Sequence, residues 1–422
     1  MHLLFFVFSF FLIALLFPFQ IAAQPLYPDT LWPVADPASV GMDQNKLLQA
    51  KNYALQSGGS GMIIRYGKVV MSWGSQTQKY DLKSTTKSFG ATALGLAVKD
   101  GKLTLQDKAQ KYHPSFGIPP DTNMATGWLD DITILHLANQ TAGFDKPGGY
   151  VKLLFAPGSK WSYSDGGPNW LAEVMTLIYK KDLYQLMFER VFTPIGINTS
   201  ELSWRNNIYR NQTIDGIPNR EFGSGINASV NAMARLGYLY LRNGIWKNTE
   251  ILPKSYIDQV RVNQAGGVPV FRPELYAAST SSHYGLLWWN NADGTLDIPN
   301  DAYWTWGLYN SHILVIPSSD IVVTRTGQSF PGTDGYSQLK GFFEPIAASV
   351  SNSPTLTPAN TPSVTGKPGD ANKDNKVDGL DYVVWLNNYN KTVSNGSSSG
   401  DFNSSGKVDG LDYVIWLSNY AK

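Results

Sequence analysis

The stretch DLKSTTKSFGATALGLAV (residues 81–98) places Ser84 and Lys87 three positions apart at the start of a small, apolar segment. Residues with this spacing lie on the same face of a helix, so the lysine amine would lie within reach of the serine hydroxyl. The free N–H groups at a helix start would also favour a developing oxyanion. The stretch therefore predicts a serine nucleophile with a lysine base, on a buried helix that ends near Asp100-Gly101.

The spacing Ser-x-x-Lys alone does not establish a catalytic pair, because the chain contains it three times. The other two copies are Ser337–Lys340 and Ser404–Lys407. The first precedes GFFEPIAASV and would start a terminal surface helix, and the second lies within the loop of an internal repeat. Position therefore favours Ser84 as the nucleophile.

The segments around this stretch predict an α+β domain. GMIIRYGKVVMSWG (61–74) reads as a β-hairpin, and HILVI and IVVTR (312–316 and 321–325) read as a second hairpin near the end of the domain. The patterns between them, including residues 166–182 and 229–244, are mostly helical. We expect the two hairpins to share one antiparallel sheet, with helices packed on it.

Two further groups follow the serine in the chain. Tyr163-Ser164-Asp165 comes just before a predicted helix, where the tyrosine could relay a proton between the serine, the lysine and the leaving group. Taken alone, this group is better explained as a helix cap at Ser164 or Asp165 beside a packed tyrosine. Trp306-Gly307-Leu308 leads into the penultimate strand, where the glycine suggests a close backbone approach and a strand N–H could bind an oxyanion. Taken alone, it fits a strand with a buried tryptophan.

The composition and the two ends of the chain give its organisation. Lys plus Arg is 34 against 33 for Asp plus Glu, which gives no electrostatic reason to expect a nucleic-acid partner. With no cysteine, disulfides, thiolate zinc sites and cysteine nucleophiles are excluded.

Residues 1–23 read as a signal peptide, with an uncleaved membrane anchor as the alternative. We expect a globular domain over residues 30–350, a Ser/Thr/Pro linker over 351–368 and a duplicated module over 369–422.

The duplicated module predicts two calcium sites. GLDYVVWLNNY (379–389) recurs as GLDYVIWLSNY (410–420), with nine of eleven positions identical. A twelve-residue loop begins before each copy and ends on its third residue. Each loop has oxygen side chains at positions 1, 3, 5, 9 and 12, and position 7 would offer its backbone carbonyl. This pattern suits Ca²⁺. The expected ligands are Asp370, Asn372, Asp374, Lys376, Asp378 and Asp381 in the first loop, and Asp401, Asn403, Ser405, Lys407, Asp409 and Asp412 in the second. Because Ser405 replaces a charged ligand, the second site should bind more weakly; two acidic turns without metal are the alternative.

The order of these motifs over residues 35–348 resembles the serine β-lactamase and penicillin-binding superfamily, most closely its esterase branch and the 6-aminohexanoate-oligomer hydrolases. The resemblance implies that Ser84 is acylated and that Lys87, with Tyr163, acts as the base, with no catalytic cofactor. Asp165 occupies the place of the family's usual Asn, which adds negative charge. The third motif, which includes Trp306, Gly307 and Leu308, carries no cation, unlike the Lys-Thr-Gly of β-lactamases. The oxyanion donors would be the N–H groups of Ser84 and Leu308.

The repeat resembles a dockerin type I module, in which position 12 is Asp and each copy is a loop with one helix. The resemblance implies calcium binding and a cohesin-like protein partner, although a self-contained calcium module is also possible. Together these features predict an extracytoplasmic serine hydrolase, typical of a bacterium, that cleaves an ester or a small amide. The alternatives are a β-lactamase or penicillin-binding DD-peptidase-like activity, and a non-catalytic binding protein with the same fold.

Overall fold

The computed structural model describes residues 25–275, 280–332, 335–350, 367–393, 396–403 and 406–421. The predicted signal peptide, nearly all of the predicted linker, and Ser405 lie outside these residues. The chain folds as two compact units, residues 1–352 and 353–422. No helix within the described ranges is both long and apolar enough to cross a membrane.

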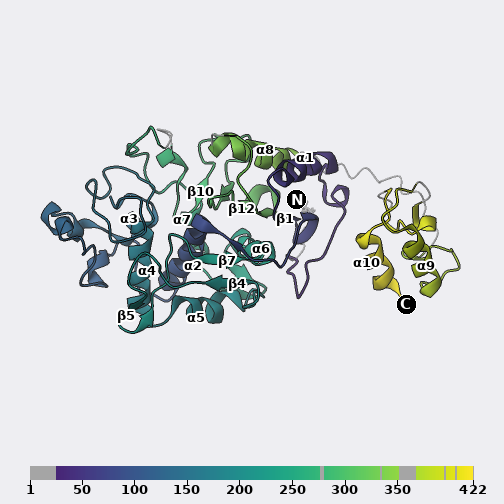
Figure 1. The fold of residues 1–422 in the computed structure, drawn as a ribbon, viewed down its shortest axis with the longest axis horizontal. Coiled ribbons are helices and arrows are strands. Elements are labelled where there is room, and N and C mark those ends of the chain that lie inside the picture. Colours follow the sequence, from purple (N-terminus) through teal and green to yellow (C-terminus); the bar gives the residue numbers. More distant parts are fainter. Residues whose placement is uncertain are drawn as a thin grey trace, which may run out of the picture. The chain divides into compact units, whose positions relative to one another are not determined.

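The larger unit is built on a six-stranded antiparallel sheet in the order β10-β11-β12-β13-β1-β2 (Figure 1). Its strands are Trp289–Asn290 (β10), Tyr303–Trp304 (β11), His312–Ile316 (β12), Ile321–Thr326 (β13), Ser60–Arg65 (β1) and Lys68–Trp73 (β2). The N-terminal hairpin pairs with the C-terminal one, with Ser60 opposite Thr326 and Arg65 opposite Ile321. The predicted sheet of two terminal hairpins is therefore confirmed.

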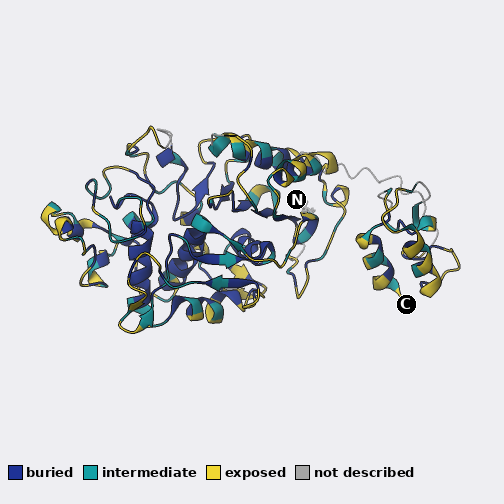
Figure 2. Ribbon diagram, in the orientation of Figure 1, coloured by how far each residue is buried: buried dark blue, intermediate teal, exposed yellow. Residues whose placement is uncertain are grey.

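Alternating side chains of β1 enter separate cores on the two faces of the sheet. Met62 and Ile64 belong to the core shared with α2, α4 and α6, whereas Ile63 belongs to the core beneath α1 and α8. All six residues of β1 are buried, because helices cover both faces (Figure 2). The helices of this unit are Gln44–Leu55 (α1), Thr86–Lys99 (α2), Ile134–Ala138 (α3), Gly166–Tyr179 (α4), Leu183–Met187 (α5), Val230–Leu241 (α6), Lys254–Val260 (α7) and Gly335–Ala348 (α8).

Short strands complete the larger unit. Three strands form a second sheet in the order β3-β7-β4. Strand β3 precedes α2 in the chain, whereas β4 and β7 follow α5. The remaining four strands form two small hairpins. The bounds are Tyr80–Asp81 (β3), Ile226–Ala228 (β7) and Leu202–Trp204 (β4), then Thr213–Ile214 (β5) with Ile217–Pro218 (β6), and Ile245–Trp246 (β8) with Thr249–Glu250 (β9).

The smaller unit consists of two copies of a loop followed by a helix, Gly379–Asn388 (α9) and Gly410–Asn419 (α10). The copies are joined by reciprocal hydrogen bonds: the Trp385 indole N–H donates to the Asp409 carbonyl, and the Trp416 indole N–H donates to the Asp378 carbonyl, both at 2.8 Å. Tyr382 and Tyr413 pack against the tryptophans of the opposite copies. The sequence repeat thus produces a structural repeat, as expected.

Candidate active site

Ser84 lies in a short 3-10 turn, Lys83–Thr85 (η2), that leads directly into α2. The Lys87 side chain, only 1% exposed, donates from Nζ to Ser84 Oγ at 3.2 Å. It also donates to the Gly223 carbonyl at 3.0 Å. The structure therefore brings the predicted nucleophile and base within hydrogen-bonding distance on a buried helix.

Ser84 is held near the ends of strands β11 and β12 by its neighbour Thr85. The Thr85 hydroxyl donates to the Ser311 carbonyl at 2.7 Å, and its oxygen lies 3.1 Å from the Thr305 hydroxyl oxygen, within hydrogen-bonding distance. Both partners border the turn between β11 and β12, so two buried hydrogen bonds fix the serine turn relative to the third motif.

Gly307 allows the closest backbone approach in this region. A Cβ placed on Gly307 would lie 2.2 Å from the Leu82 carbonyl oxygen and 3.1 Å from the Thr85 hydroxyl. Only glycine fits so near the serine turn, in agreement with the prediction of a close approach. Within the described residues, the N–H groups of Ser84 and Leu308 donate no backbone hydrogen bond, as oxyanion donors require. The Leu308 side chain itself is 59% exposed.

The Tyr163 ring packs directly against the Lys87 ammonium group. Lys87 Nζ is 4.6 Å from the centroid of the Tyr163 ring, which is 9% exposed. The ring stacks on Trp289 at 5.7 Å, and Trp289 contacts Trp306 at 5.4 Å. A continuous aromatic wall therefore connects the predicted relay tyrosine to the third motif.

Asp165 sits at the N-cap position of α4 without capping it, while the Ser164 hydroxyl accepts the hydrogen bond of the Gly167 N–H at 3.1 Å. The two Asp165 carboxylate oxygens instead form ion pairs with Lys87 and with Lys146. Burial alone would raise the pKa of Asp165, but these two ammonium groups outweigh it and hold the pKa below its usual value. The predicted extra negative charge is therefore matched by a second lysine.

Sequence reasoning missed Lys146, and also the residues that shape the rest of the lysine pocket. The Asn169 side-chain oxygen accepts hydrogen bonds from the Phe222 and Gly223 N–H groups, at 3.0 and 2.8 Å, and so places the Gly223 carbonyl beside Lys87. A Cβ on Gly223 would lie 2.9 Å from the Asp165 Cβ. No local pattern marks these residues, because each acts through contacts with distant parts of the chain.

Four aspartates at the first and last positions of the two loops are buried, whereas Asp374 is exposed. Asp370, Asp381, Asp401 and Asp412 are at most 3% exposed. Asn375 at position 6 of the first loop has φ 64°, the left-handed conformation that this position needs. No group of three or more His, Cys, Asp or Glu side chains that could hold a metal occurs within the described ranges. The expected ligand sets also draw on asparagine side chains and backbone carbonyls.

Calcium nevertheless fits the donor set of these loops. Burial raises the pKa of Asp412, and the negative charges of Asp401 and Asp409 raise it further, against hydrogen bonds from two backbone N–H groups. Carboxylates that repel one another around a loop of further oxygen atoms suit a hard cation. The residues that would hold the two ions are those predicted from the sequence, of which Ser405 is not described.

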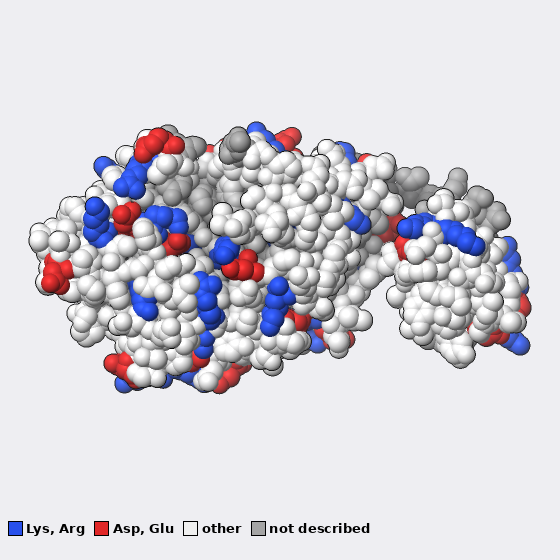
Figure 3. Space-filling view, in the orientation of Figure 1, with Lys and Arg blue, Asp and Glu red and all other residues white. Residues whose placement is uncertain are grey.

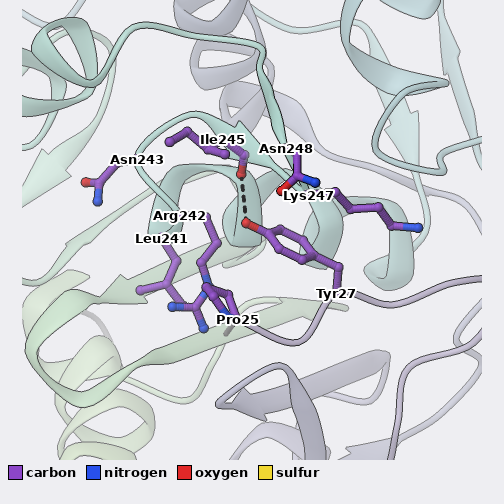
Figure 4. Close-up of a pocket in the computed structure, with 8 residues that line it drawn as sticks. All are labelled: Pro25, Tyr27, Leu241, Arg242, Asn243, Ile245, Lys247 and Asn248. Atoms are coloured by element: carbon purple, nitrogen blue, oxygen red, sulfur yellow. Dashed lines mark hydrogen bonds between the residues drawn. The ribbon is translucent and has the colours of Figure 1, made fainter. Parts of the chain in front are cut away.

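The surface of the larger unit offers other hollows and charges, but none that we find in the described ranges combines a nucleophile with a base. A pocket of about 450 Å³ is lined by Pro25, Tyr27, Leu241, Arg242, Asn243, Ile245, Lys247 and Asn248 (Figure 4). It shares no residue with the Ser84 site. Basic and acidic side chains are interspersed over the face drawn in Figure 3, consistent with the balanced composition.

The profile of the Beta-lactamase family matches residues 53–339 of this chain. The chain belongs to the β-lactamase family. A second profile, the Dockerin type I domain, matches residues 368–420. The predicted family, the α+β fold and the dockerin module are therefore confirmed.

Relatives of known sequence are distant. An uncharacterized protein of Alkalihalophilus pseudofirmus is 20% identical over 318 residues, covering 67% of this chain and 87% of that protein. A β-lactamase of Pseudomonas fluorescens is 25% identical over 180 residues, covering 39% of this chain and 45% of that enzyme.

Several solved structures share the fold of the larger unit. A family VIII carboxylesterase has a TM-score of 0.55 at 15% identity, over 73% of this chain and 99% of that one. EstCE1, a hydrolase with promiscuous acyltransferase activity, has a TM-score of 0.55 at 16% identity, over 72% and 99%. A Bacillus anthracis protein proposed to be a 6-aminohexanoate-dimer hydrolase has a TM-score of 0.58 at 16% identity, over 75% and 87%.

Proposed function

We propose that this β-lactamase-family protein is an exported serine hydrolase that cleaves an ester or a small amide through an acyl-enzyme on Ser84. The observation that carries the proposal is the 3.2 Å contact between Lys87 Nζ and Ser84 Oγ. A serine hydroxyl needs such a base to attack a carbonyl at neutral pH.

Acylation would begin when the neutral Lys87 amine takes the proton of the Ser84 hydroxyl. The Ser84 oxygen then forms a bond to the substrate carbonyl carbon, and the carbonyl electron pair moves to the oxygen, which the Ser84 and Leu308 N–H groups would stabilise. Collapse of this intermediate breaks the bond to the leaving group. The leaving group departs with the proton that Lys87 holds, handed on by the Tyr163 hydroxyl.

In deacylation, water would take the part of the attacking hydroxyl and Ser84 would become the leaving group. A water molecule gives a proton to Lys87 as its oxygen attacks the acyl carbon, and the bond to Ser84 breaks as Ser84 recovers that proton. The products are a carboxylic acid and the free enzyme. No step requires a cofactor.

The site favours an ester or a small amide over a β-lactam. Residues 305–308 of the third motif supply no cation that would attract the carboxylate of a penicillin. The aromatic wall of Tyr163, Trp289 and Trp306 ends in the partly exposed Trp306 ring, which supplies an apolar surface for an acyl chain or a ring instead.

The dockerin module would attach this hydrolase to a cohesin-like protein partner in a calcium-dependent manner. Four residues along each helix and its C-terminal end, one every three positions, expose apolar surface for such a contact. They are Leu380, Val383, Leu386 and Tyr389 in the first copy, and Leu411, Val414, Leu417 and Tyr420 in the second. An extracellular location agrees with a docking module of this kind.

The test is to incubate the protein with a p-nitrophenyl acyl ester and, separately, with a fluorescent penicillin. We expect ester turnover that Ser84→Ala abolishes, because removal of the nucleophile leaves only the binding and oxyanion contributions. The matched control is Ser337→Ala, which changes the exposed Ser-x-x-Lys of α8 and should leave turnover intact. Penicillin labelling without ester turnover would support β-lactam chemistry instead, and no reaction with either would favour a binding protein.

A further inference from the structure

Lys87, Asp165 and Lys146 form a row of three alternating charges behind the proposed nucleophile. One Asp165 carboxylate oxygen accepts from Lys87 and the other accepts from Lys146. The Tyr163 ring lies under both ammonium groups, with its centroid 4.6 Å from Lys87 Nζ and 5.3 Å from Lys146 Nζ. The side chains are 1%, 23% and 44% exposed in the order of the row, so Lys146 lies nearest to solvent.

A carboxylate in direct contact with a catalytic lysine creates a chemical difficulty. An unpaired negative charge beside Lys87 would favour the charged ammonium form of that lysine. An ammonium group cannot accept the Ser84 proton, so an unbalanced Asp165 would oppose the proposed reaction at neutral pH. The second lysine removes this difficulty, because its positive charge acts on the other oxygen of the same carboxylate.

We propose that Lys146 is a positioning residue for the Ser84 reaction, which neutralises Asp165 so that the Asp165–Lys146 pair acts on Lys87 as a nearly neutral hydrogen-bond acceptor. The inference rests on the proposed function and concerns the same site. A carboxylate with its own ammonium partner can orient Lys87 without holding a proton on it. The pair would thus serve in place of a single neutral side chain.

The backbone builds this pair into the fold. The Asp165 N–H donates to the Lys146 carbonyl at 2.9 Å, so the two residues are joined by main chain as well as by side chain. Arg210 then fixes the surrounding loops, because its guanidinium donates to the carbonyls of Gly148, Gly149 and Gly166. The loop that carries Lys146 and the start of α4 are therefore held together.

Other charged and titratable groups near this row come from several elements, and most have partners of their own. Asp81 pairs with Lys83 before α2, and Glu221 pairs with Arg205 beside Gly223. Asp145 pairs with Arg272 at 3.8 Å. The groups to be considered in any pH profile are Asp81, Lys83, Asp145, Tyr163, Arg205, Tyr209, Glu221, Arg272 and Tyr284.

The pKa shifts agree with the geometry. Burial lowers the pKa of Lys146, and the charge of Lys87 lowers it further, against the attraction of Asp165. The charge of Lys87 therefore reaches Lys146 across the carboxylate between them.

The experiment compares the pH dependence of p-nitrophenyl ester hydrolysis by the full chain and its variants. Lys146→Met should move the acidic limb of kcat/KM to higher pH by about 1 unit and lower the rate at pH 7 by about tenfold. Asp165→Asn should move the limb the other way. The double variant Lys146→Met/Asp165→Asn should return the limb close to that of the original protein, and Lys146→Arg should leave it unchanged. Lys152→Met, which changes an exposed lysine of the same loop, is the matched control.

Return of the pH limb in the double variant is the decisive result, since a merely structural ion pair would change the stability of the fold and not the pH at which kcat/KM falls. An unshifted limb in Lys146→Met, or a double variant that remains as impaired as Lys146→Met, would overturn the inference while Ser84-dependent turnover persists. If Lys146→Met does not fold, a shifted limb in Lys146→Arg overturns it in the same way. Turnover that survives Ser84→Ala would instead overturn the proposed function.

Discussion

Asp165 in the β-lactamase domain is a carboxylate that is 23% exposed and Asp412 in the dockerin module is one that is fully buried, and their pKa values shift in opposite directions. Two lysine ammonium groups surround Asp165 and lower its pKa. Burial and two further aspartates raise the pKa of Asp412. The first region balances its charges with its own side chains, whereas the second presents a negative charge that an ion from solution would balance.

The difference follows from the size of the two regions. The larger unit has cores on both sides of a six-stranded sheet and can hold an ion-pair network in place. The smaller unit has two short helices and few buried apolar side chains, a size at which metals commonly supply the missing stability. We therefore expect calcium to change the stability of the smaller unit, and substitutions of paired charged side chains to change the stability of the larger unit.

Removal of calcium should give the largest effect, and only in the dockerin module. At a calcium concentration about 1,000-fold above the dissociation constant, binding contributes about 4 kcal/mol to the free energy of unfolding of the bound form. We expect EDTA to lower the melting temperature of the module in a calorimetric scan of the full chain, and excess calcium to restore it. Ester hydrolysis should not change, and loss of activity in EDTA would contradict the separation of the two regions.

Breaking the buried charge network of the larger unit should have the next largest effect. Arg210 and Glu173 form an ion pair at 3.1 Å with both side chains at most 2% exposed. Glu173→Gln leaves the Arg210 charge without its partner, which we expect to lower the free energy of unfolding by about 3 kcal/mol. Denaturant unfolding measures this loss.

The matched control for this change is Glu189→Gln. Its partner is Lys181, and the two side chains are 57% and 36% exposed. An exposed pair contributes at most about 1 kcal/mol, so the control should remain close to the original protein. Equal losses in the two variants would show that burial of the network does not matter.

Strengthening the second calcium loop should have a smaller effect. Ser405 stands where the first loop has Asp374, and a carboxylate there adds one charged ligand. We expect Ser405→Asp to tighten calcium binding at that loop by about tenfold, or about 1.4 kcal/mol. Isothermal titration calorimetry of the full chain would show the two sites becoming more alike; weaker binding would mean that the added charge is not directed at the ion.

Removal of the Asp165 charge should have the smallest effect on stability, and this effect should depend on pH. Because its folded pKa lies below its unfolded value, Asp165 stabilises the protein fully above the unfolded pKa of about 4. This contribution is lost as the pH falls through the lower, folded pKa. Asp165→Asn should therefore melt below the original protein at pH 6, and the difference should shrink towards pH 3. A difference that grows with acid would contradict the assigned charge row.

The two regions also differ in how much their sequences predict. The dockerin module could be predicted from its sequence, since the oxygen side chains of each loop follow one another within twelve residues and the pattern occurs twice. In the larger unit, the terminal hairpins and the helix after Ser84 have local signals. Their pairing could also be expected, because each hairpin alone would leave a sheet edge unpaired.

The lysine at position 146 illustrates what the sequence could not predict. Lys87 and Asp165 are 78 positions apart, and Lys146 lies 19 positions before Asp165 in a loop without periodicity. Which lysine pairs with which carboxylate depends on the packing of α2 against α4 and on the loop that Arg210 holds. The sequence indicated an unusual charge at Asp165, and the structure supplied its partner.

The central proposal, that the Ser84 oxygen carries the acyl group, is tested most directly by acid-quench mass spectrometry. The full chain is mixed with a slowly hydrolysed p-nitrophenyl ester, quenched in acid and digested. We expect an added acyl mass on the peptide that contains Ser84, and no such mass in Ser84→Ala. An acyl mass on another peptide, or hydrolysis of the same ester by Ser84→Ala at the original rate, would contradict the proposal.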